Sequence, residues 1–270
     1  MQLLNGSGIL TETITLNSSF LFREVTIDFF LPKNISEPAS LNLLLINDGQ
    51  NLEEMNFFNL LETLHLENKI KPLLCAGIHA GKERKMEYGV ASQADYMGRG
   101  AWAEAYTNFI LKELLPFIYS NYAITSFHEK SVAGFSLGGL SALDIVWNHP
   151  REFSKAGIFS GSFWWRSLDQ NDASYDDNKH RIMQQEIRNG IFFPGLKFFF
   201  QCGNKDEAVD RNNNGIIDSI DDTMAVIDEL IAKGYKREKD IYYLEMPEGR
   251  HDVPTWGLAM PEFLNWGWGK

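Results

Sequence analysis

The chain has 270 residues and a formal net charge of −11, from 36 acidic and 25 basic side chains. This acidic balance argues against a nucleic-acid partner and against docking on anionic lipid, and no apolar run reaches the length of a membrane span. The length suits one α/β domain over residues 1–270, because no linker, repeat or low-complexity tract divides the sequence.

The elements expected in chain order follow from the hydrophobic periodicity. Residues 9–16 and 21–31 are rich in alternating and β-branched side chains and predict an antiparallel strand pair. From residue 41 onward, short apolar runs alternate with segments of helical spacing, which predicts a mainly parallel sheet with helices on both faces. The expected strands are residues 41–46, 72–78, 131–133, 156–159, 196–201 and 241–245, and the expected helices are residues 53–66, 102–122, 137–147, 175–189, 221–233 and 261–268.

The N-terminus and the cysteines bear on the cellular compartment. Residues 1–6 lack a basic region followed by an apolar segment, so no signal peptide is expected. Cys75 and Cys202 lie in apolar runs and are predicted to be buried free thiols, which favours a cytoplasmic protein. An exported form that has lost its signal remains the alternative.

Residues 134–138 read G-F-S-L-G and lie between an expected strand and an expected helix. In that context the pattern G-x-S-x-G marks a nucleophile elbow, here with Ser136 as the nucleophile. Glycines are expected on both sides because a Cβ atom there would clash with the neighbouring strand or helix. The alternative is a glycine-rich turn without a catalytic serine.

A serine hydroxyl needs an imidazole to take its proton and a carboxylate to orient that imidazole, and the expected order is serine, acid, histidine. His251 follows the last expected strand and is the predicted base, whereas His180 lies in a polar region and is expected at the surface. Asp206 follows the strand at residues 196–201 and is the predicted acid, with Glu207 as the runner-up.

Two backbone amides should stabilise the oxyanion that forms in such a reaction. One is expected from Leu137, which follows the nucleophile, and the other from Gln50, which follows the strand at residues 41–46. Gly49 is expected to give the backbone the freedom to turn the Gln50 amide inward. The alternative is an ordinary turn made of turn-forming residues.

Several further stretches extend this pattern over most of the chain. They are N-D-G-Q-N at residues 47–51, R-x-x-E-Y at 84–88, E-L-L-P-F-I at 113–118, G-F-S-L-G-G at 134–139, F-S-G-S-F-W-W at 159–165, G-N-K-D-E at 203–207, and G-R-H-D at 249–252 followed by Trp256. On these stretches the chain resembles the esterase family of α/β hydrolases, which includes enterochelin esterases, feruloyl and acetyl-xylan esterases and esterase-D-like enzymes.

The resemblance implies an α/β-hydrolase fold, a triad of Ser136, Asp206 and His251, and ester hydrolysis through an acyl-enzyme. It implies a small-molecule or saccharide ester as the partner and no organic cofactor. Arg250 stands where these enzymes often have a second glycine, and this difference bears on the shape of the pocket.

Three side chains are candidates for substrate contact. Trp164 and Trp165 follow an expected strand end and are predicted either to wall a pocket for sugar or aromatic acyl groups or to pack in the core or a lid. Arg84 is expected either to contact a substrate carboxylate or to pair with Glu87.

Residues 210–221 match the pattern of a calcium-binding loop. Gly215 takes the sharp-turn position of that loop, and an aspartate replaces the usual final glutamate. A calcium ion would have a structural role there, and the alternative is an Asn/Asp-rich loop before an N-capped helix without metal. The expected ligands are Asp210, Asn212, Asn214, the carbonyl of Ile216, Asp218 and Asp221.

Taken together, the residues predict a serine carboxylic-ester hydrolase. One alternative is an acyltransferase on the same triad, in which an alcohol displaces the acyl group. The other is a non-catalytic module on a hydrolase fold that binds carbohydrate or calcium.

Overall fold

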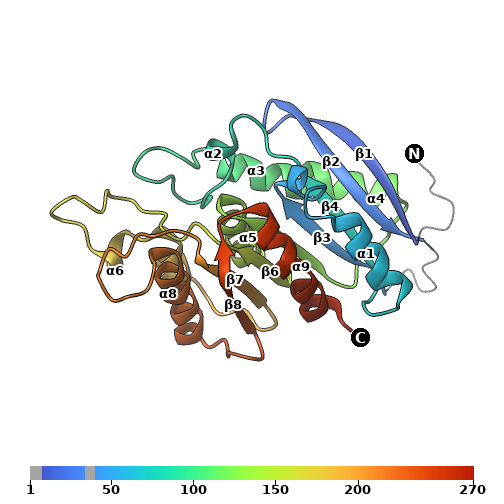
Figure 1. Cartoon of the computed structure of the whole chain (residues 1–270). Helices are drawn as coiled ribbons and strands as arrows, with labels where there is room; N and C mark the ends of the chain where they lie inside the picture. The colour runs from blue at the N-terminus through green and yellow to red at the C-terminus, as the bar shows by residue number, and fades with distance from the viewer. Residues whose placement is uncertain (1–7, 34–39) are drawn as a thin grey trace.

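The computed structural model describes residues 8–33 and 40–270 (Figure 1), so the stretch on which the signal-peptide expectation rests lies outside the described residues. The described strands form one eight-stranded sheet in the order β1-β2-β4-β3-β5-β6-β7-β8. β1 (Ile9–Ser18) and β2 (Arg23–Pro32) form the predicted antiparallel pair. β2 also runs antiparallel to β4, whereas every pairing from β4 to β8 is parallel.

The parallel strands occur where apolar runs predict them. β3 and β4 are buried along their whole length, as central strands covered on both faces should be. β7 and β8 continue past their predicted ends, because their polar final residues still pair with each other across a register shift. The bounds are β3 (Asn42–Asn47), β4 (Leu73–Ile78), β5 (Lys130–Phe135), β6 (Lys155–Phe159), β7 (Lys197–Lys205) and β8 (Ile241–Arg250).

Helices cover both faces of the sheet (Figure 1). One hydrophobic core lies under α1 and α9, and the other lies between the sheet and α3, α4, α5, α7 and α8. Their bounds are α1 (Phe57–Leu66), α2 (Arg84–Glu87), α3 (Ala103–Phe109), α4 (Leu115–Asn121), α5 (Leu137–Asn148), α6 (Asp177–His180), α7 (Ile182–Asn189), α8 (Asp218–Lys233) and α9 (Val253–Trp268), with a 3-10 turn η2 (Gly49–Asn51) and a π-helical segment η3 (Ile110–Leu114).

Several helix boundaries differ from the predicted ones for local reasons. α1 begins at Phe57 because Asn56 takes a left-handed conformation, with φ of 54°. The helix expected at residues 175–189 is broken at Arg181, whose ψ of 107° is extended. α9 begins at Val253, eight residues before the predicted start, because the Asp252 side chain caps it by accepting a hydrogen bond from the Thr255 N–H at 3.0 Å.

Cys75 and Cys202 are buried free thiols, as the sequence predicts. Burial raises the pKa of Cys202 to about 12, so this thiol stays protonated at neutral pH. Among the described residues, no helix is both long enough and apolar enough to cross a bilayer.

Candidate active site

Ser136 occupies a strained turn at the carboxyl end of β5. Its φ of 56° and ψ of −120° lie outside the regions that most residues adopt, and the helix α5 begins at the next residue. A Cβ atom on Gly134 would lie 2.3 Å from the carbonyl oxygen of Gly138, and one on Gly138 would lie 2.7 Å from the carboxylate of Asp48. The two glycines therefore allow the close packing that the sequence predicts, and Ser136 is left half-buried at the sheet edge.

A second hydroxyl lies beside that of Ser136. The Oγ atoms of Ser136 and Ser162 are 3.3 Å apart, and the Ser162 N–H donates to the Ser136 carbonyl at 3.2 Å. Ser162 is 2% exposed and follows β6, the strand next to β5 in the sheet. Sequence reasoning assigned no role to Ser162, because only the pairing of β5 with β6 brings it to Ser136.

His251 directly follows β8 and is exposed to solvent. The surrounding protein and the positive charge of Arg84 lower the pKa of His251, while the carboxylates of Asp206 and Asp252 raise it. The net effect is a lowered pKa, which favours the neutral imidazole that a general base requires. Among the described residues, His251 forms no hydrogen bond with Ser136 or Asp206.

Asp206 directly follows β7, next to β8 in the sheet. Burial raises its pKa, and the Ser160 hydroxyl, the Gly203 backbone and the charge of His251 act in the opposite direction. Both carboxylate oxygens are buried and lack a hydrogen-bond partner of ordinary geometry among the described residues. Such a carboxylate can accept a hydrogen bond from the imidazole N–H of His251.

Glu207, the runner-up acid, lies in a different environment. Its side chain is exposed, and the carboxylates of Asp218 and Asp222 on α8 raise its pKa after the larger contribution of burial. His251 influences the pKa of Asp206 but is not among the groups that act on Glu207. Asp206 and His251 therefore act on each other's pKa, which is consistent with the predicted pairing.

The two amides predicted for an oxyanion hole belong to the first residue of α5 and to the turn η2. Leu137 is the first residue of α5, and the amides of Leu137 and Gln50 donate to no acceptor within the described residues. The reason predicted for Gly49 is wrong, because Asp48, not Gly49, takes the positive φ, of 60°. Gly49 is needed for close packing, since a Cβ atom there would lie 2.2 Å from the carbonyl carbon of Gly77 in β4.

Arg84 has a partner that the sequence did not predict. Its Nε and Nη2 donate to the two carboxylate oxygens of Asp48 at 2.6 and 2.7 Å. The expected pairing of Arg84 with Glu87 is wrong, because Glu87 is held by Arg23 through two hydrogen bonds of 2.7 and 2.6 Å. Two nitrogens of the Arg84 guanidinium thus donate to the protein. Few donors remain for a two-pronged contact with a substrate carboxylate.

The adjacent residues Trp164 and Trp165 have different environments. Trp165 is fully buried, and the idea that it walls a pocket is wrong, because it packs in the core against Gly89 and Gly100. Trp164 is half-buried, and the guanidinium of Arg99 lies 4.6 Å from the centre of its ring. Trp164 alone of the pair is therefore accessible to a ligand.

The segment 210–221 has part of the geometry of a calcium loop. Gly215 has a φ of 86°, and the side-chain amides of Asn212 and Asn214 converge on Asp221, at 2.7 and 2.9 Å. Asp218 is bound to Arg211 instead. Its carboxylate accepts a hydrogen bond from the Arg211 N–H and lies 3.3 Å from the Arg211 guanidinium. Within the described residues, no three carboxylate, imidazole or thiol groups gather in a metal-binding arrangement.

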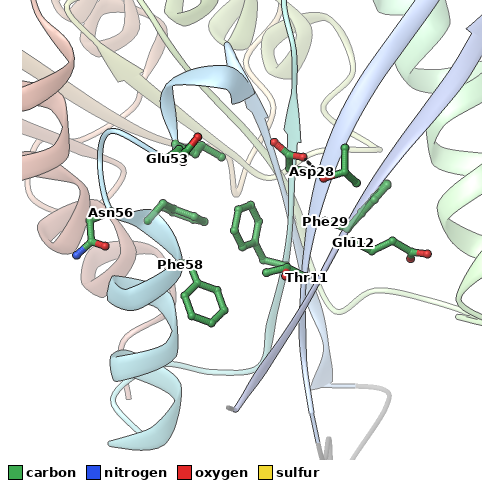
Figure 2. Close-up of a pocket in the computed structure, with 11 residues that line it drawn as sticks. Thr11, Glu12, Asp28, Phe29, Glu53, Asn56 and Phe58 are labelled. Carbon is green, nitrogen blue, oxygen red and sulfur yellow. Dashed lines mark hydrogen bonds between the residues drawn. The ribbon is translucent and has the colours of Figure 1, made fainter. Parts of the chain in front are cut away.

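A cavity of about 530 Å³ lies apart from these residues, between the β1–β2 pair and the start of α1 (Figure 2). Its lining combines aromatic rings with acidic and polar side chains, among them Phe58, Glu53 and Asp28. Asp28 is held by Thr13 and His79, both at 2.6 Å. The predicted triad does not line this cavity, which the sequence gave no reason to expect.

Comparison with known proteins gives a family match over most of the chain. A family model described as "Putative esterase" matches residues 18–266. The iron(III) enterobactin esterase of Dickeya dadantii (strain 3937) is 25% identical over 242 residues, 85% of this chain and 48% of the relative. The uncharacterized protein YbbA of Bacillus subtilis (strain 168) is 28% identical over 144 residues, 51% of this chain and 57% of the relative. The chain thus spans about half the length of these curated relatives.

Solved structures share the fold at low identity. The enterobactin esterase of Shigella flexneri, in the presence of enterobactin, superposes with a TM-score of 0.73 at 19% identity, covering 96% of this chain and 58% of that one. A ferulic acid esterase superposes with a TM-score of 0.66 at 17% identity, covering 96% of this chain and 97% of the other. These likenesses and the sheet order establish the α/β-hydrolase fold that the sequence predicts.

Proposed function

The chain belongs to the esterase family whose model it matches over residues 18–266, and we propose that it is a serine carboxylic-ester hydrolase. The observation that carries the proposal is the strained conformation of Ser136, which presents its hydroxyl between β5 and α5. His251 and Asp206 directly follow β8 and β7, so they lie at the same carboxyl edge of the parallel sheet. This arrangement supports a nucleophile, a base and an orienting acid.

The proposed reaction proceeds through an acyl-enzyme. His251 takes the hydroxyl proton of Ser136 as its oxygen attacks the ester carbonyl carbon, and Asp206 orients the imidazole. The amides of Leu137 and Gln50 donate to the oxyanion of the tetrahedral intermediate. The ester bond breaks, and the alcohol leaves with the proton held by His251. Water then gives a proton to His251 and attacks the acyl carbon. The bond between that carbon and the Ser136 oxygen breaks, His251 returns the proton to the Ser136 oxygen, and the carboxylic acid leaves.

Hydrolysis is favoured over acyl transfer by the exposure of His251 to solvent. An acyltransferase must keep water away from the acyl-enzyme, whereas water reaches this imidazole directly. The presence of Ser136, Asp206 and His251 together argues against a non-catalytic carbohydrate- or calcium-binding module. Hydrolysis of small-molecule or saccharide esters is therefore the function that the geometry supports best.

The acyl group is proposed to lie against Trp164, whose ring is accessible beside Arg99. An aromatic acyl group would stack on this ring, and an aromatic pocket wall also suits a sugar. The family relatives whose names state a substrate act on enterobactin or ferulic acid esters. Aryl, feruloyl and acetyl-sugar esters are thus the substrates to screen.

A structural calcium ion is a second, separate proposal. Asp210, Asn212, Asn214 and Asp221, with the carbonyl of Ile216, would supply oxygen ligands, which are those that calcium prefers. The positive φ of Gly215 at the sharp-turn position supports the loop geometry. Asn212 and Asn214 direct N–H groups at Asp221 and would have to turn their amide oxygens toward the ion. Asp218 would join it only by leaving Arg211. The ion would stiffen the segment that follows Asp206 and would take no part in the chemistry.

The test of the esterase proposal is intact-mass spectrometry after exposure to a fluorophosphonate probe. We expect a single adduct on Ser136 that is absent in Ser136→Ala. Ser131→Ala is the matched control, because Ser131 is a buried serine of the same strand whose hydroxyl has no partner among the described residues. A folded protein that takes up no probe would exclude an activated serine and with it the proposed function.

A further inference from the structure

The side chain of Arg84 connects two segments that are far apart in the sequence. Through Nε and Nη2 it donates to both carboxylate oxygens of Asp48, at 2.6 and 2.7 Å, in the two-pronged geometry of a strong guanidinium–carboxylate pair. Nη2 also donates to the carbonyl of Phe135, at 3.2 Å. Asp48 begins the loop after β3, and Phe135 is the residue before Ser136. One guanidinium therefore ties that loop to the turn that presents the serine.

Asp48 in turn fixes the position of Gln50. The left-handed φ of Asp48, 60°, starts the 3-10 turn to which Gln50 belongs. Both ends of the Gln50 side chain are held by the protein, because its Nε2 donates to Asp48 at 3.3 Å and its Oε1 accepts from the Ala80 N–H at 3.0 Å. The Asp48 N–H donates to the hydroxyl of Tyr88 at 3.2 Å. With both ends of its side chain bound, Gln50 has its main-chain amide left to offer.

Asp48 also touches the helix that carries the other amide. The carboxylate lies so close to the first turn of α5 that a Cβ atom on Gly138 would be 2.7 Å from it. Asp48 is 2% exposed, so its charge is shielded from water and depends on Arg84 for compensation. The loop of Gln50 and the start of α5 thus both pack against the Arg84–Asp48 pair.

We propose that Arg84 and Asp48 form a clamp that sets the distance between the amides of Leu137 and Gln50, which makes Arg84 a positioning residue of the oxyanion hole. This inference rests on the proposed function and differs from a substrate-binding role for Arg84. An oxyanion forms only as the reaction proceeds, so misplacing one donor lowers kcat and leaves KM nearly unchanged.

Arg84 has a second effect that an ordinary structural ion pair would lack. Three charged groups act on His251: Arg84 lowers its pKa, while Asp206 and its own neighbour Asp252 raise it. Removing the positive charge of Arg84 therefore raises the pKa of His251. The base then needs a higher pH to lose its proton, so the acidic limb of the rate profile moves to higher pH.

The test compares Arg84→Lys and Arg84→Met in hydrolysis of p-nitrophenyl acetate, a neutral ester. Lysine keeps the charge and loses the two-pronged geometry. In Arg84→Lys, kcat should therefore fall about 10-fold to 100-fold, somewhat less than for complete loss of an oxyanion donor. The acidic limb of the pH–rate profile should not move. Methionine loses both the charge and the two-pronged geometry. In Arg84→Met, kcat should therefore fall at least as far, and the acidic limb should move to higher pH. Arg188→Met is the control, because Arg188 makes a two-pronged pair with Glu229 between α7 and α8 and should leave kcat unchanged.

Hydrogen exchange over residues 47–52 provides a measurement that does not depend on activity. It should become faster in both Arg84 variants and stay unchanged in Arg188→Met. A wild-type protein that hydrolyses no ester and takes up no fluorophosphonate would refute the proposed function, while this exchange would still decide whether the clamp exists. The clamp is overturned if kcat and exchange are unchanged in both variants, or if only KM for an anionic ester rises.

Discussion

The contrast between the two adjacent tryptophans can be tested by truncating each one. Trp165 is fully buried, and Cβ atoms on Gly89 and Gly100 would lie 2.7 and 2.6 Å from its ring. Because both glycines have positive φ and pack on the ring edge, the backbone cannot easily collapse into the space that Trp165→Ala would leave. We therefore expect the full cost of a buried aromatic truncation, about 3–5 kcal/mol of unfolding free energy.

Trp164→Ala should behave differently. The side chain is half-buried, and its main directional contact is with the guanidinium of Arg99, 4.6 Å from the ring centre. Loss of such a cation–π contact at a partly exposed site costs about 0.5–1 kcal/mol. Urea unfolding followed by tryptophan fluorescence and circular dichroism would give both midpoints. For an aryl ester such as p-nitrophenyl benzoate, Trp164→Ala should raise KM while the protein stays folded.

The reasoning is refuted if the two variants lose similar stability. It is also refuted if Trp165→Ala is the milder of the two, since that would place the buried ring at position 164. An unchanged KM in a stable Trp164→Ala variant would remove Trp164 from the proposed pocket without affecting the argument on burial.

Two further predictions concern pH and calcium. The pKa of His251 is lowered from its ordinary value of 6.5, so the imidazole is neutral and active above that lowered pKa. We therefore expect kcat/KM to reach half its plateau below pH 6.5. An acidic limb centred above pH 7 would contradict the lowered pKa. If residues 210–221 bind calcium, 1 mM CaCl₂ should raise the midpoint of thermal unfolding, and Asp210→Asn should abolish the rise. An equal rise in the variant would place any calcium elsewhere, and no rise in the wild type would exclude a stabilising ion.

The positions of Ser136, Asp206 and His251 could be predicted because each follows an apolar run that ends at the edge of the sheet. In a parallel sheet the carboxyl ends of all strands meet at one edge, so strand order in the sequence is enough to gather these residues. The prediction required only that each strand exists, and it did not require the exact residue at which the strand ends. β7 continues to Lys205 and β8 to Arg250, so Asp206 and His251 directly follow their strands.

Side-chain partners across the fold could not be predicted in the same way. Arg84 is three residues from Glu87 in the sequence, yet α2 turns the two side chains to different partners, Asp48 and Arg23. The sequence likewise gave Trp164 and Trp165 equal standing, because nothing local says which of the two neighbouring rings faces the core. Such choices depend on which distant segment packs against the residue.

The oxyanion loop shows how these two kinds of information combine. Sequence pattern locates Gln50 after a strand, but the direction of its amide depends on the left-handed turn at Asp48. An aspartate adopts that conformation more readily than most residues, at a cost that the ion pair with Arg84 can offset. A residue that holds the loop in place also adds positive charge near His251. The proposed clamp therefore couples the geometry of the proposed oxyanion hole to the protonation of His251 through one side chain, and Arg84→Lys is the variant that separates them.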